Sequence, residues 1–214
     1  MVFNSIEFLF FIVAFFLLFF NLKGKGRLWF CLLGSYFFYG WWDWRFLALI
    51  VASTLVDFWL GRSIGMEQDS MKRKKWLITS MVMNLGFLGF FKYFNFFADS
   101  FSEVLGFFGM HASWHTLHII LPVGISFYTF QSMSYTIDVY NRAIPVEKDL
   151  LRFSTFIAFF PQLVAGPIVR ASEFLPQFDR EIRWNWDRFI SGSAQVLWGF
   201  FKKVAVGDLR APLF

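Results

Sequence analysis

The sequence predicts an all-α membrane protein, a polytopic bundle of about six to seven short apolar helices. Of the 214 residues, 57% are apolar, 23% are aromatic and only 16% are charged. Soluble domains keep about a quarter of their residues charged, whereas a bundle in lipid needs charge only in its loops. The helices are expected at the apolar runs 6–20, 28–42, 46–61, 76–97, 119–140, 153–169 and 189–201. We therefore expect one membrane domain over 1–214, embedded in the lipid bilayer.

The first run, 6–20, is expected to be a retained membrane helix. A secretory signal has a basic leading segment and a cleavage site of small residues. Here Glu7 lies at the start of the run, and no such site precedes Asn21. The runs 28–42, 46–61 and 76–97 supply the next three helices. Several runs are shorter than the roughly 20 residues of a straight span, which favours short helices in a thinned bilayer or helices shielded inside the bundle.

Basic residues are concentrated in alternate loops. The segments 22–27 and 62–75 hold three and five Lys or Arg residues, whereas 40–45 and 92–118 hold only Arg45 and Lys92. The positive-inside rule places the first two segments in the cytoplasm and the N-terminus outside. The net charge of +5 is explained by these loops, and because no nucleic-acid motif accompanies it, nucleic acid is not an expected partner.

The segment 98–110 is expected to be a separate helix that lies in the outer interface, because its apolar side chains share one helical face. It is followed by three histidines at helical spacing, His111, His115 and His118. Three imidazoles can bind zinc, but no nearby carboxylate completes a site. A solvated loop is the preferred interpretation, and no metal site is predicted.

The run 119–140 carries polar side chains along one face of a helix. Lipid offers no water to such groups, so they normally face a protein interior or a wet cavity. We expect this stripe, with Gly124 on the same face, to line a pathway or a pocket. The alternative is that the side chains tie helices together. The candidates are Tyr128, Gln131, Ser134, Tyr135 and Asp138.

The run 153–169 is interrupted by three helix breakers, Pro161, Gly166 and Pro167. Proline removes a backbone donor, and a broken backbone at membrane depth must be buried in protein or line a cavity. We expect a re-entrant or sharply kinked segment, while the loop charges are equally compatible with a full crossing. Gln162 and Arg170 join the pore-lining or structural candidates. The segment 172–188 is expected to be an interfacial loop or short helix, and 189–201 the last apolar helix.

Two further polar residues lie inside apolar runs. Asp57 either lines a channel or bonds to a neighbouring helix, and the second interpretation is preferred because Arg62 is close in sequence. Asn84 is expected to join helices. The chain contains no G-x-S-x-G, H-E-x-x-H or Walker motif, so no residue of this chain is assigned as catalytic.

Two strings carry a resemblance to a known family: 121–140, LPVGISFYTFQSMSYTIDVY, and 159–170, FFPQLVAGPIVR. They resemble the membrane-bound O-acyltransferase family, and within it the bacterial branch of the membrane subunit of alginate O-acetylation. The segments 34–46, 91–97 and 199–204 are similar to that branch as well, so the resemblance covers nearly the whole chain.

The resemblance implies transfer of an acyl group from a cytoplasmic thioester, through a membrane pore, to a hydroxyl of an extracytoplasmic polysaccharide such as alginate. The donor would be acetyl-CoA or an acyl carrier protein, with no bound cofactor. The expected partner is an extracytoplasmic acetyltransferase or another polysaccharide-modifying protein. The expected location is the bacterial cytoplasmic (inner) membrane, crossed several times.

The resemblance also implies a catalytic histidine in a later helical segment, which none of the three histidines matches. We therefore expect this chain to be the N-terminal part of such a fold, supplying entry helices and part of the pore, and to be inactive alone. The alternative is a non-catalytic scaffold or truncated remnant. A small transporter is a third hypothesis, which the absence of an inverted repeat disfavours.

Overall fold

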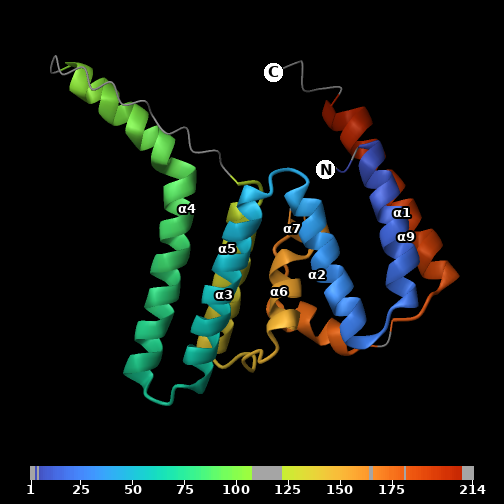
Figure 1. The fold of residues 1–214 in the computed structure, drawn as a ribbon, viewed down its shortest axis with the longest axis horizontal. Helices are drawn as coiled ribbons and strands as arrows, with labels where there is room; N and C mark the ends of the chain where they lie inside the picture. Colours follow the sequence, from blue (N-terminus) through green and yellow to red (C-terminus); the bar gives the residue numbers. More distant parts are fainter. Residues whose placement is uncertain (1–2, 4, 108–121, 164–165, 181, 209–214) are drawn as a thin grey trace. The chain divides into compact units, whose positions relative to one another are not determined.

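The computed structural model describes the chain except for residues 1–2, 4, 108–121, 164–165, 181 and 209–214 (Figure 1). The described residues form helices, turns and loops, with no strand among them, so the all-α prediction is confirmed. The helices are α1 (Ile6–Asn21), α2 (Gly24–Gly40), α3 (Arg45–Met66), α4 (Ser70–Phe107), α5 (Ile125–Tyr140), α6 (Leu150–Ala158), α7 (Phe160–Leu163), α8 (Ala171–Phe174), the 3-10 helix η1 (Leu175–Asp179), α9 (Trp186–Phe201) and the π-helix η2 (Lys202–Asp208).

The chain divides into two units. One comprises Met1–Arg27 and Arg180–Phe214, and the other comprises Leu28–Asp179. In the first unit, hydroxyl and amide side chains cap both long helices: Ser5 accepts from the backbone N–H of Phe8 at the start of α1, and Asn185 accepts from that of Arg188 at the start of α9. Such caps satisfy backbone donors that a helix start leaves free.

The core of the second unit is built by α3, α4 and α5, which contact one another pairwise (Figure 1). The approach of α3 to α5 requires a glycine: a Cβ on Gly61 would lie 2.7 Å from the ring of Tyr135. Tyr135 is fully buried and packs on Phe153 of α6, with ring centroids 4.8 Å apart. The fourth helix of this core, α6, therefore lies against both α3 and α5.

Two described helices are long and apolar enough to cross a membrane, namely α3 and the part of α4 over Ser70–Ser102. Helix α1 is apolar but shorter. Along α4, large apolar side chains lie exposed on the protein surface, as a helix in contact with lipid requires. They include Ile78, Val82, Leu85, Phe90, Phe96 and Phe97.

Several predicted boundaries are corrected. The segment 98–110 is not a separate helix: α4 continues without interruption to Phe107, and 108–110 lie outside the described residues. The reason is local, because no Gly or Pro occurs between Phe90 and Leu105 to end the helix. Helix α2 begins at Gly24, so Lys25 and Arg27 belong to its first turn and not to a loop.

The start of α5 is also corrected. Pro122, Val123 and Gly124 form a turn, and the helix begins only at Ile125. Gly124 is the residue before the helix and has φ +78°, a conformation that glycine adopts without steric cost. It is therefore not part of the helical stripe, although the turn brings it close to α7, as described below.

Candidate functional site

The predicted break in 153–169 lies at Phe159, between α6 and α7. Pro161 has no N–H to donate to the carbonyl of Ile157, so one continuous helix cannot form. In α7 it occupies the first turn, where that donor has no helical partner in any case. The backbone N–H groups of Gln162 and Leu163 both bond to the Phe159 carbonyl, at 3.1 Å. Gly166 lies at a bend, with its N–H bonded to the Gln162 carbonyl at 3.1 Å, and Pro167 follows without regular secondary structure. The helix is therefore interrupted as expected, while re-entry into the membrane stays a prediction.

Two predicted candidates meet at the carbonyl that this break leaves free. The amide of Gln131, from α5, and the amide of Gln162, from α7, each donate to the Phe156 carbonyl oxygen at 2.8 Å. Both glutamines are buried. A buried carbonyl without a donor is costly, and here two side-chain amides replace the missing helical bond.

The donor on the other side of the break is satisfied by α2. Ser35 is fully buried, and its hydroxyl accepts from the backbone N–H of Phe160 at 3.2 Å. The same hydroxyl donates to the Cys31 carbonyl at 2.7 Å. Sequence reasoning missed Ser35, since a single serine in an apolar run carries no signal of a partner 125 residues away.

The turn before α5 lies directly against α7. A Cβ on Gly124 would lie 2.6 Å from the Leu163 carbonyl oxygen. The turn is held from α2 as well, because the Tyr39 hydroxyl donates to the Val123 carbonyl at 2.9 Å. The broken segment is thus enclosed by α2, α5 and this turn, all within the second unit.

The remaining stripe residues differ in their surroundings. Tyr128 is buried, and its hydroxyl has no hydrogen-bond partner among the described residues. Tyr135 accepts a hydrogen bond at its hydroxyl from the backbone N–H of Glu147, at 2.9 Å. The Ser134 hydroxyl donates to the Gln131 carbonyl, and Asp138 is half-buried near the end of α5. Arg170 is exposed and is the residue before α8.

A second buried polar group joins α3, α4 and α5. The amide of Asn84 donates to the Asp57 carboxylate at 2.6 Å and to the Ser80 carbonyl at 3.0 Å. The Ser80 hydroxyl in turn donates to that of Thr136 on α5. The Ser132 hydroxyl is also buried and has no hydrogen-bond partner among the described residues. Asp57 and Asn84 therefore bond between helices, as the preferred interpretation of each predicted.

An ion-pair group holds the start of α6. The Arg152 guanidinium bonds to Glu147 at 3.0 Å and to the Asp179 carboxylate of η1 at 2.9 Å. The hydrogen bonds from Arg152 hold the pKa of Asp179 below its ordinary value of 3.8. This pair ties η1 back to α6, which carries the break.

We expect the Asp179 pair to make stability depend on pH. Because the folded pKa of Asp179 lies below the unfolded one, its contribution is present above pH 3.8 and is lost as pH falls through the folded pKa. Thermal unfolding of the detergent-solubilised protein should therefore show a smaller loss of Tm on acidification for Asp179→Asn than for the wild type. The exposed position keeps the difference small. Asp187→Asn, an exposed acid of the other unit, is the control, and equal pH dependence in both variants would contradict the assignment.

One cavity among the described residues lies away from the break. It measures about 350 Å³ and lies where the ends of α3 and α5 meet the start of α4. The cavity is not lined by Tyr128, Gln131 or Tyr135 of the predicted stripe. The expectation that the stripe lines a pathway stays a prediction. The three histidines, His111, His115 and His118, lie outside the described residues.

Comparisons with known proteins identify close relatives over the whole chain. A protein of Pseudomonas aeruginosa named "probable alginate O-acetylase" is 41% identical over 215 residues, covering 100% of this chain and 41% of the relative. A protein of the same name from Azotobacter vinelandii is 40% identical, covering 100% of this chain and 43% of the relative. A peptidoglycan O-acetyltransferase of Helicobacter pylori is 32% identical, covering 86% of this chain and 39% of the relative.

The chain thus spans 41% to 43% of the length of the two alginate-related proteins. No protein-family model matches it, and no solved structure matches it.

Proposed function

Because the chain belongs to the membrane-bound O-acyltransferase family, in its alginate O-acetylase branch, we propose that it forms part of an enzyme that transfers acetyl groups to an extracytoplasmic polysaccharide. A membrane location is supported by the two helices that are long and apolar enough to cross a bilayer. The observation that carries the proposal is the 41% identity to a named O-acetylase along the full length of this chain.

The role proposed for this chain is to supply entry helices and one wall of the acyl-transfer path. In support, the α6–α7 break places polar backbone and two glutamine amides in the interior of the second unit. Tyr128 adds a buried hydroxyl that the described residues leave without a partner. Buried polar groups of this kind call for an explanation, and a polar group passing along the path would supply one.

In this proposal the acetyl group comes from a cytoplasmic thioester, either acetyl-CoA or an acyl carrier protein. It passes to a hydroxyl of alginate or a related polysaccharide on the outer side, with the help of an extracytoplasmic acetyltransferase partner. The chain lies in the bacterial inner membrane with its N-terminus outside, in keeping with its loop charges. No residue of this chain is assigned as the general base.

A chimaera with a longer relative tests the proposal. In the Pseudomonas aeruginosa relative, the 215 matched residues are replaced by this chain. The chimaera should restore O-acetyl groups to the alginate of a strain that lacks its own O-acetylase, as measured by NMR of the purified polymer. Normal membrane abundance of the chimaera with no acetylation would contradict the proposal.

A further inference from the structure

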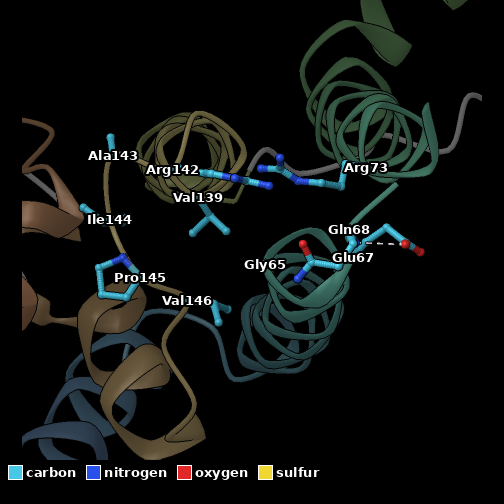
Figure 2. Close-up of a pocket in the computed structure, with 10 residues that line it drawn as sticks. All are labelled: Gly65, Glu67, Gln68, Arg73, Val139, Arg142, Ala143, Ile144, Pro145 and Val146. Carbon is cyan, nitrogen blue, oxygen red and sulfur yellow. Dashed lines mark hydrogen bonds between the residues drawn. The ribbon is translucent and has the colours of Figure 1, made fainter. Parts of the chain in front are cut away.

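The cavity at the ends of α3 and α5 is lined by two arginines, Arg73 and Arg142. Figure 2 shows the two side chains extending toward one another, Arg73 from α4 and Arg142 from just after the end of α5. The cavity volume of about 350 Å³ is at the lower end of the range of small-molecule sites. Two like charges directed into one space repel each other, and an anion between them would remove that repulsion.

Arg142 occupies a backbone position that favours glycine. The N–H of Ala143 bonds to the Asp138 carbonyl, and the N–H of Arg142 bonds to that of Val139. This is the hydrogen-bond pattern of a Schellman motif, whose left-handed residue is usually glycine. Here that residue is Arg142, with φ 58°. A strained non-glycine residue at such a position points to a use for its side chain.

Arg73 is held in place by groups that leave its charge unpaired. Its guanidinium donates to the carbonyl oxygens of Ile64 and Tyr140 and lies over the Tyr140 ring, 5.2 Å from the centroid. Carbonyl groups orient a guanidinium without neutralising it. Among the described residues, neither Arg73 nor Arg142 forms an ion pair.

The acid beside the cavity does not compete for these charges. Glu67 contributes to the lining, but its carboxylate accepts from the backbone N–H groups of Gln68 and Asp69. In Figure 2 it points away from the arginines, whereas the Gln68 amide points toward the cavity. The space thus presents two guanidinium groups and one amide.

We propose that this cavity binds a phosphate group between Arg73 and Arg142. Guanidinium groups bind phosphate through paired, charge-assisted hydrogen bonds. The phosphate belongs either to an anionic lipid headgroup or to a soluble phosphate compound. The site is separate from the α6–α7 break and does not depend on the proposed acetyl transfer.

The test uses the full chain and two probes. Isothermal titration with inorganic pyrophosphate, in detergent, measures binding of a soluble phosphate. Native mass spectrometry after extraction from vesicles of phosphatidylcholine and phosphatidylglycerol measures retention of the anionic lipid. The wild type should bind one of them, and that probe identifies the source. Arg142→Gly and Arg73→Gln should each weaken this binding about tenfold or more.

Arg142→Gly suits the left-handed backbone, so its Tm should be no lower than that of the wild type. Lys72→Gln is the matched control, because Lys72 is exposed, precedes Arg73 and does not line the cavity. Its binding should stay within about twofold of the wild type. Failure of the wild type to bind either probe, or equal weakening in all three variants, would overturn the proposal.

Discussion

Replacing Gly124 by alanine is expected to prevent the turn before α5 from lying against α7. The new Cβ would lie 2.6 Å from the Leu163 carbonyl oxygen, and the backbone at φ +78° disfavours any side chain. A left-handed non-glycine residue and an overpacked contact each cost a few kcal/mol, so the total destabilisation is about 2–6 kcal/mol. The carbonyl cannot rotate away, because it is part of the main chain.

The measurement is the thermal unfolding of the detergent-solubilised variant together with its membrane abundance. Gly86→Ala is the matched control, since a Cβ there meets nothing within 4 Å and alanine favours an exposed helix by up to about 1 kcal/mol. The control should be as stable as the wild type or slightly more so. A Gly124→Ala protein with unchanged Tm would show that the turn and α7 are not in contact.

The second large effect is expected from removing both glutamine amides at the Phe156 carbonyl. Gln131→Leu or Gln162→Leu alone leaves one donor, so each should cost about 1 kcal/mol. The double variant leaves a buried carbonyl without a partner, and its cost should exceed the sum of the single costs by about 1–2 kcal/mol. The two substitutions should therefore show clear coupling in a double-mutant cycle of unfolding free energies.

The same variants, placed in the chimaera, separate a structural role from a functional one. Lost acetylation with normal abundance would assign Gln131 and Gln162 to the acyl-transfer path, whereas lost protein would assign them to packing. Gln177→Leu is the control, because Gln177 also donates to a backbone carbonyl but on the exposed surface. It should change neither abundance nor acetylation. Purely additive single costs would contradict the shared-carbonyl geometry.

The inward face of α5 could be predicted from the sequence, but the hydrogen-bond partners of its polar side chains could not. The spacing of Tyr128, Gln131 and Tyr135 predicted one inward face, and all three are buried. Periodicity carries this information because a helix repeats every 3.6 residues. It carries none about partners, so the bond from Gln131 to the Phe156 carbonyl, 25 residues away, could not be foreseen.

The start of α5 and the length of α4 were mispredicted for related reasons. Apolar content continues through 119–124, but Gly124 adopts a left-handed turn that composition does not indicate. In α4, the change from apolar to mixed residues after Phe97 suggested a boundary, yet no Gly or Pro lowers the helix propensity between Phe97 and Gly106, and the helix continues to Phe107.

By itself, the sequence determined that this protein is an apolar helical bundle with a broken segment around Pro161, because hydrophobic periodicity and missing backbone donors act locally. Its strings over 121–140 and 159–170 also carried the resemblance to the membrane-bound O-acyltransferase family. Only the tertiary structure decided which groups repair the break and which arginines share a cavity. Ser35 with Phe160, and Arg73 with Arg142, are far apart in sequence, and hydrogen bonding and charge depend on distances in space that only packing sets.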